Sequence, residues 1–281
     1  MAIKVLPFII PKPDHATLVV QEDQGQRFYD KLHQHQEIQI SLIKKGEGTF
    51  IIGDHIGVFQ KGDIFVIGEH LPHVFNNDLS EEEVHMISLF FMKSSYGEHF
   101  FELPEFKRLE PVFTASILGF KLDGSNNDLA DLMGRIPSQS QLDRFISFME
   151  VLKMISKENT QALSSIIHTK SYGEEEGKRM RDIFTYTLQN FHSNIKLGQV
   201  ADIAHMTPNA FCRYFKQRTN KTYINFLLEI RIGNACKLLS KQTDYSIAEI
   251  SFQSGFNNLT NFNRKFKSLK GLTPSEFKKR T

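Results

Sequence analysis

The C-terminal third of this chain repeats one order of apolar and polar positions. In each copy a short segment with apolar residues at helical spacing is followed, after a turn, by a basic segment. The short segments are Val200–Ala204 and Ile247–Ser251, and the basic segments are Arg213–Lys216 and Arg264–Lys267. Each copy then reaches a residue that tolerates left-handed backbone, Asn220 or Gly271. This order predicts a short helix, a turn, a basic helix and a stop, twice, which is typical of two helix-turn-helix units.

Each predicted basic helix has an apolar face built on two phenylalanines. Phe211 and Phe215 form one pair, and Phe262 and Phe266 form the other. A spacing of four places both rings of a pair on one side of a helix, so these rings indicate a core rather than a ligand site. Polar residues offset from each pair are left to face outward.

A long helix is predicted between the two copies, over about Tyr223–Leu239. At ~1.5 Å per residue it is roughly 25 Å long, so it can hold two basic helices about one turn of DNA (~34 Å) apart. Its predicted inward residues are Ile224, Leu227, Leu228, Ile232, Ala235 and Leu239.

The N-terminal third follows a different pattern. Ile38, Ile40 and Leu42 alternate with polar residues, and turns containing glycine separate this run from Thr49–Ile52 and Ile64–Ile67. Short strands at regular spacing, separated by such turns, predict a β-sandwich or barrel over residues 28–92. The signal over residues 94–119 is mixed and assigns no element.

A helix is predicted to begin after Ser138, where Ser-Gln-Ser-Gln forms a capping box. Its apolar stripe has spacings of three and four, with a companion stripe just before it. The stripe residues are Leu142, Phe145, Ile146, Met149, Leu152 and Ile155, and the companions are Leu129, Leu132 and Met133. The stripe either packs against the chain's own barrel or forms the seam of a homodimer, and we favour the dimer. A polar, flexible linker is expected over residues 173–177.

The charge is divided unevenly. Residues 178–281 hold 18 Lys and Arg against 6 Asp and Glu (+12), and residues 1–177 hold 16 against 26 (−10), which sum to the net +2 of the chain. A basic end that coincides with a doubled helical pattern indicates binding to double-stranded DNA.

The remaining composition points to a cytoplasmic protein. The two cysteines form neither a disulfide framework nor a zinc-binding spacing, as expected in a reducing compartment. The apolar N-terminus is interrupted by Pro7 and Pro11, and we interpret it as an arm or edge strand, with no membrane segment.

Candidate DNA-contacting residues lie on the outward faces of the basic helices. In the first helix Asn209, Cys212 and Arg213 share a face near the start, and Lys216 follows. Arginine can pair with guanine and asparagine with adenine, whereas lysine suits phosphates. In the second helix the outward residues are Leu259, Thr260, Asn261, Asn263, Arg264 and Lys267.

The segment Val200–Lys279 resembles the AraC-type transcriptional regulators, whose C-terminal domain has two helix-turn-helix units joined by a long helix. The matching motifs are Ala201–Ala204, Arg213–Lys216, Ile247–Ile250, Gly255-Phe256, Phe262–Lys267 and Thr273–Phe277. The resemblance implies base contacts at Asn209, Cys212 and Arg213, and at Leu259, Thr260, Asn261, Asn263 and Arg264. A packed thiol at Cys212 and a packed side chain at Leu259 are the alternatives.

The N-terminal half more weakly resembles the cupin-like barrels that serve as effector domains in this family. His33-Gln-His35, Gly46, Gly62-Asp63 and Pro72–Asn77 occur in the expected order. Metal-binding cupins use histidines and a glutamate, but here the carboxylate position is Gln39, a poor ligand for a transition metal. The residues His33, His35, Glu37, Gln39 and His73 therefore predict a pocket for an uncharged polar effector. A three-histidine metal site and histidines that only satisfy the barrel interior are the alternatives.

These patterns predict an α+β protein: a cupin-like barrel (residues 1–120), a helical dimerisation segment (121–170), a linker (171–178) and an all-α DNA-binding domain (179–281). The family resemblance implies a dimeric transcriptional activator that recruits RNA polymerase in response to a small-molecule effector, such as a sugar or related metabolite. No catalytic residue, cofactor or metal ligand is assigned. A metal-dependent cupin enzyme with a DNA-binding tail and a regulator controlled by a protein partner are the alternatives.

Overall fold

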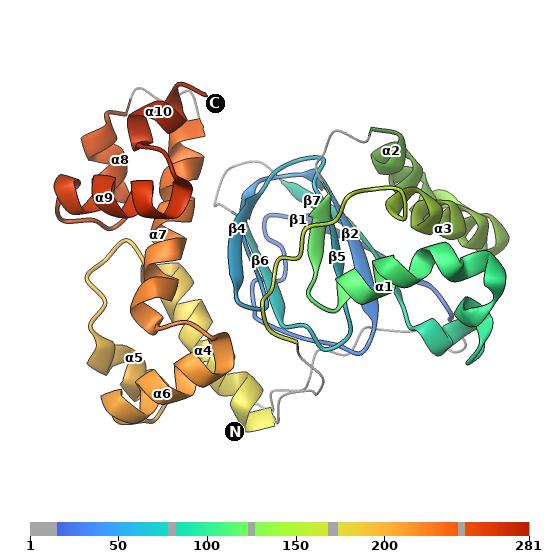
Figure 1. Ribbon diagram of the computed structural model, residues 1–281, viewed down its shortest axis with the longest axis horizontal. Helices are drawn as coiled ribbons and strands as arrows, with labels where there is room; N and C mark the ends of the chain where they lie inside the picture. The colour runs from blue at the N-terminus through green and yellow to red at the C-terminus, as the bar shows by residue number, and fades with distance from the viewer. Residues whose placement is uncertain (1–15, 78–82, 123–126, 168–173, 241–244, 281) are drawn as a thin grey trace. The chain divides into compact units, whose positions relative to one another are not determined.

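The computed structural model describes residues 16–77, 83–122, 127–167, 174–240 and 245–280. The chain forms two compact units, with the chain boundary between Gly177 and Lys178 (Figure 1). The predicted N-terminal arm, residues 1–11, lies outside the described residues. We call the N-terminal unit the barrel domain and the C-terminal unit the helical domain.

The barrel domain contains two antiparallel sheets, which confirms the predicted sandwich or barrel. The larger sheet has the order β1-β7-β2-β5-β8, and the smaller has the order β4-β3-β6. The strands are β1 (Val19–Gly25), β2 (Ile38–Lys45), β3 (Gly48–Ile52), β4 (His55–Phe59), β5 (Ile64–Ile67), β6 (His73–Asn77), β7 (Val84–Phe91) and β8 (Phe120–Leu122).

Central strand β2 is buried on both faces. Ile40 and Leu42 belong to an apolar cluster shared with helix residues such as Phe148, whereas Ile43 belongs to a second cluster with Phe50. The sequence alternation of β2 therefore separates an outer, helix-covered face from an inner face toward the smaller sheet. The residues between the isoleucines, including Gln39, are buried inside rather than exposed to solvent.

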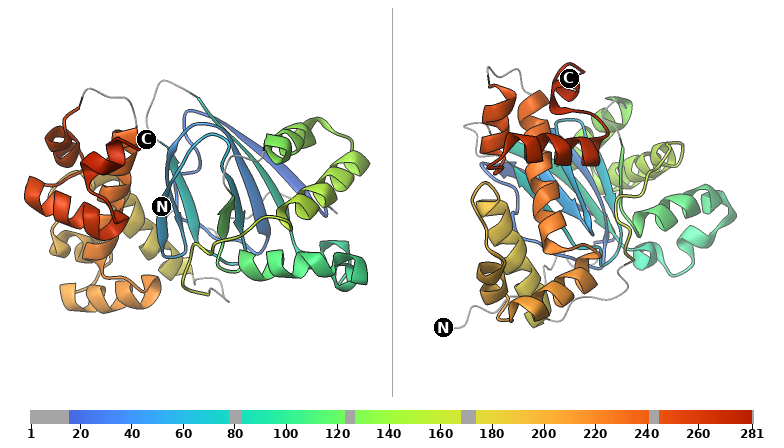
Figure 2. Two further views of the ribbon diagram at one scale, coloured as in Figure 1. Left: turned by 45° about the horizontal axis from the view of Figure 1, so that its top comes forward. Right: turned by 60° about the vertical axis from the view of Figure 1, so that its left-hand side comes forward.

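Helices cover the outer face of the larger sheet (Figure 2). The α-helices are α1 (Glu110–Ser116), α2 (Asn127–Arg135) and α3 (Gln141–Ile155), and the 3-10 helices are η1 (Lys93–Tyr96), η2 (Phe100–Glu102), η3 (Pro104–Leu109) and η4 (Ile136–Ser138). The region over 94–119, which the sequence left unassigned, therefore consists mainly of short helical turns. Many phenylalanines in these turns pack ring against ring, and this packing holds them without long regular elements.

The structure divides the predicted stripe of α3 between two environments. Leu152 and Ile155 are buried in the outer apolar cluster of their own domain, with Met149 packed against its edge. In contrast, Leu142 is 68% exposed and Ile146 is 57% exposed. The single continuous stripe is therefore wrong. At ~3.6 residues per turn, successive spacings of three rotate the stripe from the outward face at Ile146 to the buried face at Ile155.

After α3 the chain returns along the barrel as a strap, residues 162–166. The backbone N–H groups of Leu163 and Ser164 donate to the carbonyls of Gly119 and Leu118. The buried carboxylate of Asp54 accepts hydrogen bonds from Ser164 Oγ (3.0 Å), the Ser165 backbone N–H (2.7 Å) and Ser165 Oγ (2.7 Å). Asp54 therefore fixes the strap that leads toward the helical domain.

The helical domain contains the two predicted helix-turn-helix units. Its helices are α4 (Glu174–Asn190), α5 (Leu197–Ile203), α6 (Pro208–Thr219), α7 (Tyr223–Ser240), α8 (Ile247–Gln253), α9 (Leu259–Lys270) and α10 (Pro274–Lys278). Asn220 (φ 54°) and Gly271 (φ 74°) end α6 and α9 in left-handed conformation, as the repeat predicted. Helix α4 begins at Glu174, so residues 174–178 are helical rather than part of a linker; residues 171–173 lie outside the described residues.

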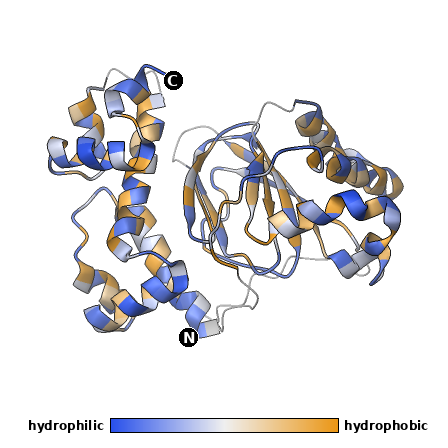
Figure 3. Cartoon of the chain, viewed as in Figure 1, coloured by the Kyte–Doolittle hydropathy of each residue, from blue (hydrophilic) through white to orange (hydrophobic). Residues whose placement is uncertain are grey.

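Aromatic side chains form the core of this domain. Hydrophobic and hydrophilic residues alternate along its helices, as Figure 3 shows. Phe211 and Phe215 contact Tyr223, and Phe262 contacts Phe256 and Phe266. The buried Tyr223 hydroxyl pairs with Thr187 Oγ1 at 2.9 Å, which links α7 to α4. Most inward residues predicted for α7 are buried or half-buried, but Ile224 is 58% exposed, so its predicted inward position is wrong. Its neighbour Tyr223 occupies the buried position instead.

The strap generates a testable prediction. Asp54→Ala removes the shared acceptor and should lower the free energy of unfolding of the barrel domain by about 1–3 kcal/mol, because buried donors are left unpaired. Amide exchange at Leu163 and Ser164 should accelerate with it. The exposed Asp131→Ala is the control and should change stability by less than about 0.5 kcal/mol. Unchanged exchange at the strap would show that Asp54 does not hold it.

Candidate functional site

Helix α6 turns a polar face outward because its opposite face is buried in the core of the helical domain. Thr207 caps the helix by accepting from the Ala210 N–H at 3.3 Å, and the rings of Phe211 and Phe215 are fully buried. The residues predicted to contact DNA lie on the remaining surface. They are Asn209, Cys212, Arg213 and Lys216, and all are exposed. The free thiol of Cys212 is exposed as well, which contradicts the alternative of a packed thiol.

Helix α9 repeats this arrangement. Asn258 caps it by accepting from the Asn261 N–H at 2.9 Å, and Phe262 and Phe266 are fully buried. The predicted contacts on its outer face are all exposed: Leu259, Thr260, Asn261, Asn263, Arg264 and Lys267. Leu259 is 44% exposed, so it is available to an apolar contact rather than packed in the core.

Arg264 is already oriented on the surface of α9. Its guanidinium donates to Asn261 Oδ1 at 2.9 Å across one helical turn. Such a bond restricts a long side chain to few rotamers before any partner is bound. Arg264 and Asn261 thus form a preorganised pair of hydrogen-bonding groups, the kind that can read base edges in a major groove.

A second candidate site lies inside the barrel domain, where His33, His35 and His73 converge. Their ring centroids are 4.2 Å (His33–His73) and 5.0 Å (His35–His73) apart. The structure therefore brings together the three histidines that the sequence selected. Residue His73 begins β6 and pairs with His33 through backbone hydrogen bonds in both directions, which explains why distant sequence positions meet.

Each of these histidines directs its Nδ1 atom to a backbone carbonyl. The bonds join His33 to Lys31 O (2.8 Å), His35 to Glu37 O (3.0 Å) and His73 to Leu71 O (2.8 Å). A carbonyl only accepts, so each Nδ1 carries the hydrogen and each neutral ring keeps a lone pair on Nε2. The Nε2 atom of His73 is buried and has no hydrogen-bond partner among the described residues.

Gln39 extends the cluster into a buried polar chain. Its amide lies 3.0 Å from His35 Nε2 and 2.6 Å from Ser41 Oγ, and Ser41 Oγ lies 2.8 Å from Ser88 Oγ. Because His35 Nε2 is an acceptor, the group that faces it must be the amide NH2, and the amide oxygen then accepts from Ser41. With the amide in this orientation, each hydrogen bond of the buried polar chain joins a neutral donor to a neutral acceptor.

Burial favours the neutral forms of His35 and His73, because it lowers the pKa of each ring. Desolvation lowers the pKa of His35, although Gln39 and Glu37 oppose the shift. Desolvation and the neighbouring His33 and His35 lower the pKa of His73 well below its usual value. Predicted residue Glu37 is also buried, with its carboxylate 3.6 Å from His35 Nδ1, too long for a good hydrogen bond.

The cluster fits two kinds of occupant. The available nitrogen atoms of the three histidines all lie within 4.8 Å of one another, and neutral imidazoles with Nδ1 held by carbonyls are typical ligands of zinc, nickel or iron. The position beside them is Gln39, however, so no carboxylate completes a metal shell. The same lone pairs, with the amide and hydroxyls, can accept from and donate to the hydroxyl groups of an uncharged ligand.

Comparisons with known proteins agree with this architecture. Residues 15–92 match the AraC-like ligand binding domain, and residues 200–280 match the helix-turn-helix domain; together they cover more than half of the chain. A barrel joined to a domain with two exposed, basic reading helices defines a DNA-binding regulator with a ligand-binding domain. The chain belongs to the AraC-type transcriptional regulators.

Two relatives align along most of this chain. The uncharacterized HTH-type transcriptional regulator YdeC of Bacillus subtilis is 23% identical over 96% of this chain and 92% of its own length. The HTH-type transcriptional activator RhaR of Mannheimia succiniciproducens is 23% identical over 89% and 87%. The crystal structure of ToxT from Vibrio cholerae O395 aligns with 94% of this chain and 98% of its own at 15% identity, with a TM-score of 0.39, which supports no conclusion about the site. Among the described residues, no helix is long and apolar enough to cross a membrane.

Proposed function

We propose that this regulator binds operator DNA as a homodimer through α6 and α9, and activates transcription by recruiting RNA polymerase when an uncharged polar metabolite occupies the barrel cluster. The observation that carries the DNA-binding part is the exposure of every predicted contact on α6 and α9, in a segment with a net charge of +12 (18 basic and 6 acidic residues). Helices α6 and α9 both contact α7, which joins the two helix-turn-helix units. At ~1.5 Å per residue, the 18 residues of α7 give a bar about 27 Å long.

The DNA interface is tested by two substitutions in the full chain. Arg213→Ala should cost about 1–3 kcal/mol of binding and relax the preference at one base pair. Lys216→Ala should weaken binding to all sequences alike and reduce the salt slope by about 1. The control Lys153→Ala, on α3, should change neither. Titrations of labelled duplexes at several salt concentrations measure both effects, and binding by residues 178–281 without salt dependence would contradict the proposal.

An exposed apolar face on α3 supports the proposed dimer. Leu142 and Ile146 are one helical turn apart and both are more than half exposed. Two large aliphatic side chains at this spacing form the kind of apolar contact that a second copy can cover. Phe148 and Val151, on the opposite face of the same helix, are buried in the domain core and hold α3 in place.

Ile146→Glu should separate the dimer without unfolding it. A carboxylate at the centre of an apolar seam is costly to bury, whereas it is well solvated on a monomer. We expect monomers in analytical ultracentrifugation together with an unchanged circular dichroism spectrum. The control Ile167→Glu, at another exposed isoleucine, should remain dimeric. A dimeric Ile146→Glu protein would place the seam elsewhere.

The polar barrel cluster supports an uncharged effector. Its histidines are neutral acceptors, and its amide and serines supply both donors and acceptors, a set that matches several ligand hydroxyl groups at once. Sugars and related metabolites are the effectors that the family resemblance suggests. The convergence of three imidazoles is the observation that favours the second candidate, a metal-dependent cupin activity in the same barrel.

Substitution of the cluster separates these candidates. A metabolite screen by thermal shift should find an effector that stabilises the wild-type protein, since a ligand of the folded state raises apparent stability. His35→Ala and His73→Ala should each abolish that shift and leave DNA affinity within about twofold. The surface variant His85→Ala should retain the shift. Stoichiometric metal in the purified protein, lost in both cluster variants, would instead support the metal site.

A further inference from the structure

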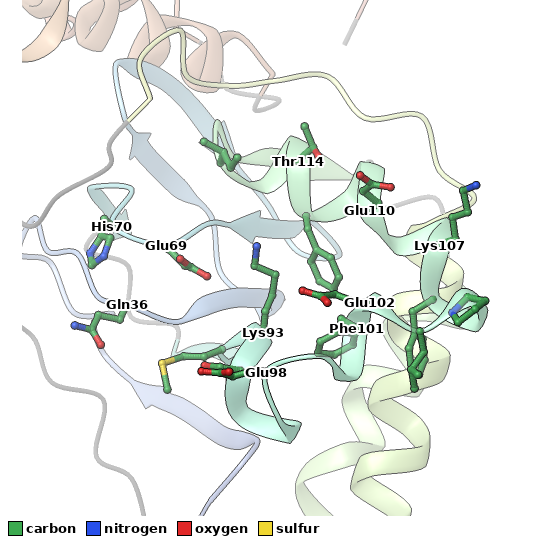
Figure 4. A pocket seen from close by; sticks show the side chains of 17 residues that line it. Gln36, Glu69, His70, Lys93, Glu98, Phe101, Glu102, Lys107, Glu110 and Thr114 are labelled. Carbon is green, nitrogen blue, oxygen red and sulfur yellow. The ribbon is translucent and has the colours of Figure 1, made fainter.

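A second cavity of about 1010 Å³ lies in the barrel domain, beside the barrel cluster but built from other residues. It opens where β5 and β7 end and β2 begins, and the helical turns η1–η3 with α1 form its opposite wall (Figure 4). Its lining includes Glu69 and His70 but none of the residues His33, His35, Gln39 or His73. It is therefore a separate site, and its volume is at the upper end for small-molecule pockets.

The walls of this cavity are acidic. Four carboxylates line it, on Glu69, Glu98, Glu102 and Glu110, against the two lysines Lys93 and Lys107. These carboxylates come from different elements, so they surround the hollow rather than cover one exposed helix face. A concave surface with an excess of carboxylates concentrates cations, because low-dielectric walls focus the field.

The floor of the cavity is aromatic. Phe101, Phe106 and Phe113 line it and are only partly buried, although their rings contact one another, with centroids 5.1 Å (Phe101–Phe113) and 5.5 Å (Phe101–Phe106) apart. Ring faces attract cations and also cover an apolar body. Carboxylates above partly exposed phenylalanines thus match a molecule that carries both a positive charge and an apolar part.

Lys93 is one of the two lysines that line the cavity. Its side chain extends into the hollow between the carboxylates of Glu69 and Glu102, as Figure 4 shows. The exposed lysine stem is flexible, so its ammonium group can give way to a ligand cation. The ammonium of Lys93 therefore occupies the place that we expect a bound organic cation to take.

The loop that carries Glu69 connects this cavity to the barrel cluster. His70 has a positive φ of 58°, and its backbone N–H donates to the His35 carbonyl at 2.8 Å. Left-handed backbone at a residue other than glycine stores strain that neighbouring contacts must support. The backbone of this loop therefore joins the wall of the cavity to the segment that carries His73.

We propose that this cavity binds organic cations with an apolar body, such as aromatic or alkyl amines, at a site distinct from the histidine cluster. The proposal does not depend on the identity of the effector in the cluster. It requires that positive charge on the ligand, and not size alone, determines affinity.

The test uses three ligands of nearly equal size and different charge: phenethylammonium, 2-phenylethanol and phenylacetate. Binding to the full-length protein is measured by isothermal titration calorimetry or ligand-observed NMR. Phenethylammonium should bind about tenfold more tightly than 2-phenylethanol, the scale of a cation held by aromatic rings and carboxylates. Phenylacetate should bind most weakly.

Three variants locate the site. The double change Glu69→Gln with Glu102→Gln should weaken phenethylammonium about tenfold, since it removes two carboxylates without changing shape. Lys93→Gln should strengthen it about threefold, because a competing cation is removed. The control Glu105→Gln, on an exposed glutamate of η3 outside the lining, should leave affinity unchanged.

The outcomes are distinct. Tighter phenylacetate binding that Lys93→Gln abolishes would overturn the proposal, because Lys93 would then recognise an anion. Equal affinity for the three ligands, or no binding of phenethylammonium at millimolar concentration, would also overturn it. DNA binding by the same variants should equal that of the wild type, so a failure here leaves the regulator function intact.

Discussion

Burial of strand β2 on both faces is the constraint on which the barrel domain depends. Ile40 and Leu42 on its outer face require the cover of α1–α3, and its inner face must fit against the aromatic side chains of the smaller sheet. Polar residues on that inner face, Gln39 and Ser41, consequently lie in a dry interior and must bond to one another or to a ligand. The binding chemistry of the domain therefore follows from a packing requirement.

In the helical domain, buried phenylalanine rings determine which residues face outward. A ring pair four residues apart fixes the rotation of α6, and a second pair fixes α9, which decides the residues that each helix presents outward. Caps from Thr207 and Asn258 fix where each helix begins. The polar surface is thus set by buried contacts, and the outward residues predicted to contact DNA can vary without loss of the fold.

Features encoded by nearby residues were predictable from sequence. The doubled order of helix, turn and stop, and the alternation along β2, depend on local periodicity and turn chemistry. The division of the α3 stripe between a buried and an exposed face was not, because it depends on which side of the helix packs against the sheet. Ile224 was misplaced because its neighbour Tyr223 has a hydroxyl partner in Thr187 of another helix. The second cavity was missed because its walls come from irregular turns over 94–119 that carry no periodic signal.

The length of α7 bears on the shape of the DNA that the proposed interface would bind. At ~1.5 Å per residue the 18 residues of α7 measure about 27 Å, less than the ~34 Å repeat of the duplex. If α6 and α9 enter successive major grooves of one DNA face, as we propose, a spacing set by this shorter helix favours a duplex that curves toward the protein. Bending energy depends on base sequence, so flexible steps between the two contacted segments contribute to operator choice although no side chain touches them.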